Sequence, residues 1–406
     1  MNCEVEFLPV GDGTRPGDAI VIRYGSDEAF RLMIVDGGTL EVGKQVVEHV
    51  RQHFGADTVV SHVVVTHADA DHASGIREVL TGLKVERLWV HMPWNSASAA
   101  LPYFASKEWT AATLANELIA SYDILRDIVS IAIDRSVTIA EPFAGAEIGP
   151  FTVLSPAREI YAWLLPQFDK TPDADRTAIE RDGIWIGKAP GILARLFERA
   201  AATVQKWFIE SWSNERLKDG GCTSASNESS VVLYGDFRPS RPILLTGDAG
   251  IVALTLAAAF AEGRGLPLGN FQFVQIPHHG SIRNVGPTVL NRLVGPVLPE
   301  GISTSPFSAF VSAPKDDATH PRQMVPRIDI LRINCLAGSI ETLAVIESGR
   351  LRYRPHLKRA RTTRTHLAGH GRRNPIDSPS LRPRGARFCV REVGARTWKL
   401  QIKYAK

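Results

Sequence analysis

Short β-branched apolar runs alternate with segments of helical periodicity along the first 150 residues. Runs bounded by Gly, Asp or Pro predict strands, and apolar residues three and four positions apart predict helices. The predicted strands are residues 19–24, 31–35, 62–66, 85–90 and 151–154, and the predicted helices are residues 42–54, 73–80 and most of 103–129.

The pattern changes between residues 157 and 220. No strand run appears there, and several stretches have helical spacing, so we predict an α-helical insertion over 157–220. Strand patterns return afterwards at residues 230–234, 242–245, 271–276 and 309–312, with a hairpin over 341–353 and a second hairpin over 388–404.

Two β-rich halves with helices outside them predict an α/β protein, specifically an αββα sandwich. The predicted main domain covers residues 1–354 and contains the insertion. Residues 355–406 form a C-terminal extension, which is rich in Arg, Thr, Pro and Gly over most of its length. We expect this extension to be basic and partly disordered.

The composition excludes several classes of protein. Of 406 residues, 44% are hydrophobic and 22% are charged, so the chain can bury a core and is not disordered overall. No apolar run of about 18 residues and no signal-peptide pattern occurs, so we expect a cytoplasmic protein that does not enter membranes. Neither a disulfide framework nor a cysteine metal cage is indicated, because no CxxC pair links Cys3, Cys222, Cys335 and Cys389.

Positive charge is concentrated near the end of the chain. Between residues 350 and 387 there are twelve Lys or Arg and a single acid, Asp377, whereas the whole chain carries a net charge of only +4. The rest of the chain is therefore acidic. Such a basic segment predicts salt-sensitive, sequence-independent binding to nucleic acid. The alternative is a solvated terminus that keeps the protein soluble.

A dense set of metal-binding side chains follows the predicted strand 62–66. His67, Asp69, Asp71 and His72 lie within six residues, and Asp69 and Asp71 would repel each other strongly without a cation. The alternative is a polar loop that caps the next helix, but a cap needs one acid rather than two acids and two histidines. The sequence therefore predicts a metal site.

Two further strand ends carry candidate ligands. Asp248 ends a buried apolar strand and His278 ends another, and ligands gather at strand ends in α/β sheets. A buried carboxylate is costly unless it is paired or bound to a metal. The alternatives are that Asp248 caps the following helix and that one histidine of the His278-His279 pair is structural.

These motifs together resemble the metallo-β-lactamase superfamily. The segment THADADH at 66–72 resembles its metal motif, with Asp69 where most members have His, as in the metallo-hydrolase domain of the competence protein ComEC. The resemblance covers about residues 3–353, apart from the insertion. It also rests on PGDA at 16–19, VDGG at 35–38, NESSV at 227–231, LTGDA at 245–249, PHHGS at 277–281 and His320-Pro321.

The resemblance implies a set of roles for these residues. The first ion would be held by His67, Asp69 and a bridging Asp248, and the second by Asp71, His72, Asp248 and His278. Asp18 and Asp36 would orient the ligating histidines, and Asn227 and Ser281 would contact substrate phosphate. Catalytic roles would fall to Asp71, His279 and His320, the two histidines as candidate proton donors.

One departure from the family pattern affects the metal. Members with two ions usually supply another His just before the central strand pair, whereas Asn227 stands at that position here. Fewer imidazoles and more carboxylates give the first site harder Lewis-base ligands, which makes Mn²⁺ an alternative to Zn²⁺. We therefore expect one or two divalent ions, either Zn²⁺ or Mn²⁺.

The expected function is hydrolysis of a phosphodiester by a metal-bound hydroxide. The resemblance to the ComEC domain implies DNA as the substrate, which the metal residues alone do not select. Two other classes remain open. One is a metallo-hydrolase of a small or lipid-linked substrate, such as a phosphocholine ester, a cyclic nucleotide or a lactone. The other is a catalytically silent nucleic-acid-binding module. The sequence indicates nucleic acid as a partner through the basic tail and identifies no protein partner.

Overall fold

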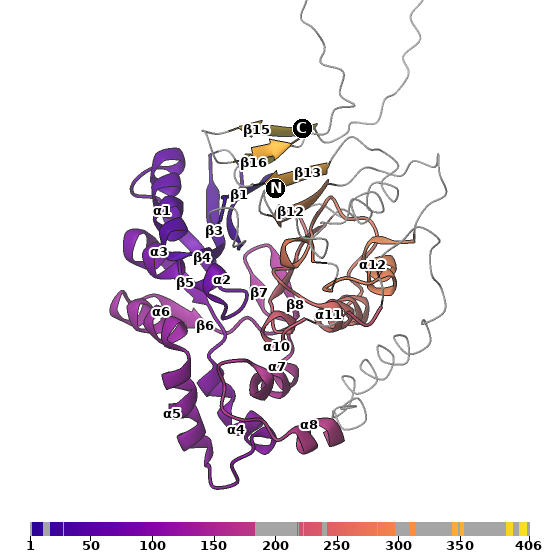
Figure 1. Cartoon of the computed structure of the whole chain (residues 1–406). Coiled ribbons are helices and arrows are strands. Elements are labelled where there is room, and N and C mark those ends of the chain that lie inside the picture. Colours follow the sequence, from indigo (N-terminus) through magenta and orange to yellow (C-terminus); the bar gives the residue numbers. More distant parts are fainter. Residues whose placement is uncertain are drawn as a thin grey trace, which may run out of the picture.

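Two β-sheets lie face to face between outer layers of helices (Figure 1). The structure is a computed structural model. It describes residues 2–10, 17–26, 28–182, 217, 219–221, 223–237, 242–281, 283–296, 308–313, 343–347, 350–352, 387–392 and 398–403.

Both sheets are mixed, and each has eight strands among the described residues. In spatial order the first sheet consists of β15 (Arg387–Glu392), β16 (Trp398–Lys403), β1 (Asn2–Phe7), β2 (Ala19–Gly25), β3 (Phe30–Gly37), β4 (Val59–Val64), β5 (Lys84–Trp89) and β6 (Thr138–Ala140). The second sheet consists of β14 (Arg350–Arg352), β13 (Leu343–Glu347), β12 (Ser308–Ala313), β11 (Phe273–Gln275), β10 (Ile243–Leu245), β9 (Val232–Gly235), β8 (Phe151–Ser155) and β7 (Glu147–Ile148).

The helices cover the outer faces of the sheets. Figure 1 shows α1, α3 and α6 beside the first sheet and α11 and α12 beside the second. The helices are α1 (Leu40–Phe54), α2 (Ala70–Ala73), α3 (Ile76–Gly82), α4 (Ala97–Ala100), α5 (Ala111–Ser121), α6 (Asp123–Asp134), α7 (Arg158–Leu164), α8 (Arg176–Asp182), α10 (Ala225–Glu228), α11 (Ile251–Gly263) and α12 (Pro287–Val294). Short 3₁₀-helices are η1 (Pro93–Ser96), η2 (Leu101–Tyr103), η3 (Leu165–Gln167) and η5 (His278–Gly280).

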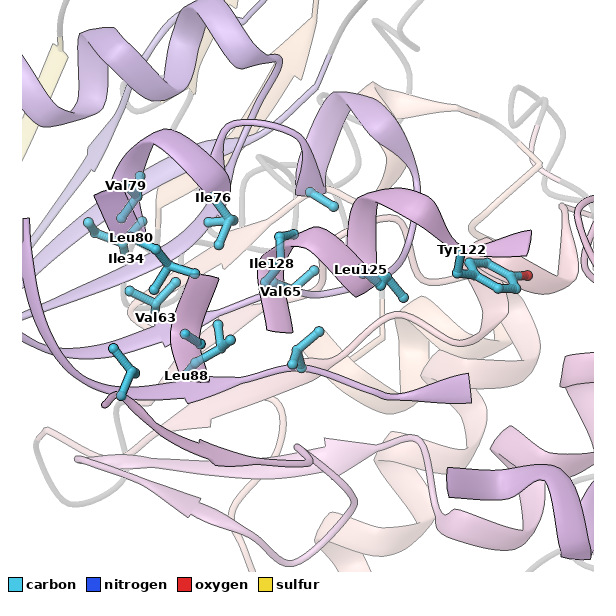
Figure 2. Packing of buried hydrophobic residues seen from close by; sticks show 14 of the residues in the cluster. Ile34, Val63, Val65, Ile76, Val79, Leu80, Leu88, Tyr122, Leu125 and Ile128 are labelled. Carbon is cyan, nitrogen blue, oxygen red and sulfur yellow. The ribbon is translucent and has the colours of Figure 1, made fainter. Parts of the chain in front are cut away.

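Three clusters of buried apolar side chains separate four layers of secondary structure, which are helices, sheet, sheet and helices. One cluster joins the first sheet to its helices, and Figure 2 shows part of it. A second cluster joins the second sheet to α11 and α12. The third lies between the sheets, where the Phe7 ring stacks on Phe310 with centroids 5.5 Å apart. The predicted mixed α/β architecture with two sheets is confirmed.

The helix predicted over residues 73–80 is confirmed from Ile76 onward, but it is not one continuous helix, because two short helices stand there. α2 ends at Ala73 and α3 begins at Ile76, with Gly75 between them. At Gly75 a β-carbon would lie 2.0 Å from the carbonyl oxygen of Gly37, and at Gly43 one would lie 2.3 Å from the oxygen of Gly75. This close approach of three backbone segments interrupts the helical periodicity.

The predicted insertion over 157–220 is described only in part. Its first helix, α7, contributes Ile160, Tyr161 and Leu164 to the cluster that also joins the first sheet to its helices. This part of the segment therefore shares the main core. Residues 183–216 lie outside the described residues.

The last two strands belong to the first sheet. β15 and β16 pair antiparallel, as predicted for a hairpin, and β16 also pairs antiparallel with β1, where Val5 faces Leu400. The C-terminal extension predicted from residue 355 therefore supplies part of the main fold. Its basic segment at 353–386 lies outside the described residues.

No helix within the described part of the chain is both long and apolar enough to span a bilayer.

Candidate metal centre

The candidate site lies at one edge of the sheets, where several strands end. β3 and β4 are parallel; Asp36 lies at the end of β3, and the loop at 66–72 follows β4. β10 and β11 are also parallel, and they lead into Asp248 and into the His278-His279 pair. Parallel strands place their carboxyl ends at the same edge of a sheet, which is a common position for ligand binding.

Asp248 is the centre of the site, and its Oδ2 atom faces the Nε2 atoms of four histidines. The distances are 3.4 Å to His72, 3.7 Å to His278, 3.7 Å to His279 and 3.9 Å to His67. Two ligands of one tetrahedral zinc ion, each about 2.0–2.2 Å from it, lie roughly 3.3–3.5 Å apart. The nitrogen–oxygen spacings around Asp248 are therefore close to those of groups that share a metal ion.

The three buried imidazoles turn Nε2 toward Asp248, while Nδ1 of each ring contacts another group. Nδ1 of His72 donates to Asp36 at 2.8 Å, and Nδ1 of His279 donates to the backbone carbonyl of Ser312 at 2.9 Å. Nδ1 of His67 lies 3.0 Å from the Thr66 hydroxyl. Within the described residues the Nε2 atoms of all three histidines have no hydrogen-bond partner. Buried polar atoms are rarely left unpaired, so this arrangement fits a bound cation.

Asp36 supports the loop that carries two of these histidines. One oxygen accepts from the backbone N–H of Thr66 at 2.8 Å, and the other accepts from the Thr66 hydroxyl at 2.6 Å and from His72. Asp36 is fully buried and has a φ of 57°. Left-handed backbone at a residue other than glycine is costly and concentrates at functional sites.

Asp69 and Asp71 occupy different positions in the site. Asp69 accepts from the Ser226 hydroxyl at 2.6 Å, and its other oxygen lies 3.6 Å from Nε2 of His67. Asp71 groups with His72 and His279, with ligand atoms within 4.8 Å of one another. Asp69 precedes α2 but makes no capping hydrogen bond with its side chain, so helix capping does not account for this carboxylate.

The two adjacent histidines both face Asp248 because the backbone turns in the left-handed region. φ is 46° at His278, 56° at His279 and 82° at Gly280. The side chain of His279 is 7% exposed and that of His278 is 34% exposed. His279, rather than His278, therefore belongs to the buried group of potential ligands, while His278 lies at the solvent side.

Two asparagines contact the His278 ring. Nδ2 of Asn227 lies 3.3 and 3.4 Å from the two ring nitrogens and donates to the Thr223 hydroxyl at 2.7 Å. Oδ1 of Asn284 lies 2.8 Å from Nδ1 of His278. Asn284 was missed in the sequence because it lies in a loop with no distinguishing motif, so only the folded geometry reveals it.

The remaining predicted residues lie around this centre or outside the described part. Asp18 accepts from Gln275 at 2.7 Å and has no hydrogen bond to a histidine among the described residues, although it groups with Asp36 and His72. The Ser281 hydroxyl accepts from the backbone N–H of Arg283 at 3.3 Å. His320 lies outside the described residues.

The charges in the site are strongly coupled. Burial opposes protonation of His72, but the carboxylates of Asp248 and Asp36 hold its pKa well above the usual value. Burial and the neighbouring His72 also oppose protonation of His67, and Asp69 and Asp248 nevertheless raise its pKa. Burial would raise the pKa of Asp248, yet the surrounding histidines hold it well below the usual range. Without a metal, His67 and His72 therefore stay protonated to a higher pH than a free imidazole, whereas burial lowers the pKa of His279 to about 4.

We expect metal affinity to fall as the pH is lowered, beginning above pH 6.5. The raised pKa values of His67 and His72 mean that protons occupy Nε2 until the pH exceeds those values. Each displaced proton makes the apparent affinity fall about tenfold per pH unit. Calorimetric titration with Zn²⁺ or Mn²⁺ in buffers of different ionisation enthalpy measures the protons released. Release of no protons at pH 6 would contradict this assignment of ligands.

Glu228 caps the helix that follows Asp248. Its carboxylate accepts from the backbone N–H of Ala253 at 2.7 Å at the start of α11. Asp248 is therefore not needed as the cap of this helix, which was the alternative to a ligand role. The preceding residue is Asn227, so the same short helix α10 contacts His278 and fixes α11.

We expect Glu228→Gln to flatten the pH dependence of stability. Burial raises the pKa of Glu228 from 4.5 to about 7, despite hydrogen bonds from the helix N-terminus. Below pH 4.5 Glu228 is protonated in both the folded and the unfolded protein. Between pH 4.5 and 7 Glu228 is ionised in the unfolded protein but still protonated in the folded one. The wild type should thus lose on the order of 3 kcal/mol of unfolding free energy relative to Glu228→Gln over that interval. Urea unfolding of both proteins at several pH values tests this, and parallel curves would contradict it.

Comparisons with known proteins leave the family open. No protein-family model matches the chain, and no curated protein matches it. A solved structure from Thermotoga maritima, provisionally described as a metallo-β-lactamase, is similar over 61% of this chain and 79% of that chain. The sequence identity is 12% and the TM-score is 0.28. At such values the function has to be argued from the site itself.

Proposed function

We propose that the protein is a metal-dependent hydrolase that holds one or two divalent ions around Asp248. The observation that carries the proposal is the convergence of four Nε2 atoms on Oδ2 of Asp248, three of them buried without another partner in the described residues. A carboxylate and imidazoles are ligands that suit Zn²⁺, and the added carboxylates make Mn²⁺ the alternative.

The proposed ligands are His67, His72, Asp248 and His279, with Asp71 beside them. The last of the histidines differs from the expectation drawn from the resemblance, which favoured His278. His279 is the better candidate because its Nδ1 is bonded to a backbone carbonyl and its Nε2 is buried and unpaired within the described chain. Asp69, which is 43% exposed, lies at the rim beside His67.

The protein side chains would position the substrate and move the proton. A bound ion supplies Lewis acidity, which lowers the pKa of water and stabilises negative charge on the reacting oxygens. Asp36 and Thr66 hold the loop of ligands rigid. His278 lies at the solvent side with Nε2 directed toward Asp248, so it can exchange a proton with a leaving group. Asn227, which contacts His278, can donate to a substrate oxygen at the same place.

The proposed substrate is a phosphodiester, and DNA is the favoured source. The support is the cluster of basic residues between 350 and 387, which would attract a polyanion. The test is a panel of single-stranded DNA, duplex DNA, RNA and a generic small phosphodiester, each with Mn²⁺ or Zn²⁺. Turnover of the small ester alone would favour the small-substrate hydrolase, and binding without any turnover would favour the silent binding module.

Neutralising the basic segment should weaken DNA binding without affecting the metal site. We expect replacement of the nine Lys and Arg between residues 354 and 384 by Gln to raise KM for DNA. The logarithmic salt slope should flatten by about 0.9 for each lost contact with duplex phosphate. Turnover of the small phosphodiester is the control and should be unchanged.

Substitution is preferable to truncation in this experiment. A cut near residue 355 would also remove β15 and β16, and β16 pairs with β1. A salt slope that does not change in the substituted protein would show that the segment does not bind DNA.

A further inference from the structure

Asn284 connects the two loops that carry Asp248 and the histidine pair. Its side chain is fully buried. Its Oδ1 atom lies 2.8 Å from Nδ1 of His278, and its Nδ2 atom donates to the backbone carbonyl of Asp248 at 2.8 Å. A longer contact of 3.4 Å joins Nδ2 to the carbonyl of Ala249. One amide therefore spans the ends of β10 and β11.

The chemistry of these partners fixes the orientation of the amide. Backbone carbonyls can only accept hydrogen bonds, so the NH₂ group of Asn284 must face Asp248 and Ala249. The reversed orientation would place Oδ1 against two carbonyl oxygens. The amide oxygen therefore faces His278, and because it can only accept, Nδ1 of His278 must carry a proton.

The other asparagine is compatible with the same protonation state. With Nδ1 protonated, Nε2 of a neutral His278 has a free lone pair. Nδ2 of Asn227 lies 3.3 Å from Nδ1 and 3.4 Å from Nε2, so it does not distinguish the two ring nitrogens. Nε2 also lies 3.7 Å from Oδ2 of Asp248. The acceptor oxygen of Asn284 at Nδ1 is therefore the contact that selects the tautomer with the proton on Nδ1.

We infer that Asn284 is a positioning residue that fixes the tautomer of His278, so that Nε2 faces Asp248 and the substrate side as a proton acceptor. Asn284 does not touch the substrate itself. Without its oxygen, the His278 ring would lose the acceptor that holds the Nδ1 proton. Groups that orient a functional histidine in this way typically contribute about 10- to 100-fold to affinity or activity.

The first test reads the tautomer directly and needs no substrate. Nitrogen NMR of the metal-free full-length chain distinguishes a protonated from an unprotonated ring nitrogen, and the signal lost in His278→Gln identifies His278. We expect Nδ1 protonated and Nε2 unprotonated in the wild type, and a mixture of tautomers in Asn284→Leu. A proton on Nε2 in the wild type would overturn the inference, whether or not any variant folds.

The second test asks whether Asn284 acts through His278 or by supporting the Asp248 loop. Only this test rests on the proposed hydrolase function. Asn284→Leu should lower kcat about 10- to 100-fold with a smaller change in KM. In the His278→Gln background the same substitution should cost little more, because its route of action is gone. Equal losses in both backgrounds would show that Asn284 acts only by supporting Asp248. Absence of all turnover would refute the proposed function but leave the tautomer measurement intact.

Discussion

Asp248→Asn is expected to abolish hydrolytic turnover and to lower the amount of bound metal. The amide keeps the shape of the side chain but removes the negative charge that faces four imidazoles. An amide NH₂ group would also point a donor toward a cation. We expect a loss on the order of 10³-fold or more in kcat/KM, since removal of a central catalytic group has effects of this size. Elemental analysis of the purified protein measures the metal.

The matched control is Asp236→Asn. Asp236 follows β9, the strand beside β10, but it is exposed and belongs to none of the groups of potential ligands in the described chain. This variant should keep its full metal content and activity. If Asp248→Asn retained as much metal as Asp236→Asn, Asp248 would not be a ligand, and the proposed function would lose its central observation.

Asp36→Asn is expected to leave a folded protein that binds metal about 10- to 100-fold more weakly. The amide oxygen can still accept from the backbone N–H of Thr66. Its NH₂ group, however, replaces the oxygen that accepts from His72. His72 would then have to accept at Nδ1 and carry its proton on Nε2, which is the wrong tautomer for binding a metal.

Two comparison variants make the Asp36 experiment specific. Asp36→Ala leaves the Thr66 and His72 donors buried without an acceptor, so it should lower the free energy of unfolding by about 3 kcal/mol or more. Asp57→Asn alters an almost fully exposed carboxylate beside Lys84 and should change neither stability nor metal affinity. Normal metal affinity in Asp36→Asn would show that the proton on His72 is not set by Asp36.

The parts of the fold that depend on local pattern could be predicted from the sequence. The strands β2, β3 and β5 and the helix α1 have clear sequence patterns, and all lie close to their predicted positions. The break at Gly75 was missed because it arises from contact with Gly37 and Gly43, which are distant in sequence. The pairing of β16 with β1 joins residues nearly 400 positions apart, and no local pattern indicates such a partner.

In the candidate site, too, some residues could be predicted from local sequence pattern and others depend on contacts between distant segments. The loop at 66–72 and Asp248 stand at strand ends, so their convergence follows from sheet topology. The choice between His278 and His279 depends on the left-handed turn and on a carbonyl of β12, which the motif alone does not reveal. Gln275 and Asn284 act through contacts with residues 28 or more positions away, apart from the contact with His278. Such residues have no signature in a single sequence.

The position of β1 between β2 and β16 has a consequence for synthesis of the protein. The ribosome makes residues 2–7 before the other strands of this sheet, and β2 can pair with them early. The other edge of β1 stays open until residues 398–403 have left the ribosome. An open strand edge is a template for pairing with another chain, so nascent molecules on one messenger RNA would be vulnerable to mutual association throughout elongation. Binding of chaperones to this edge during translation would shorten that exposure.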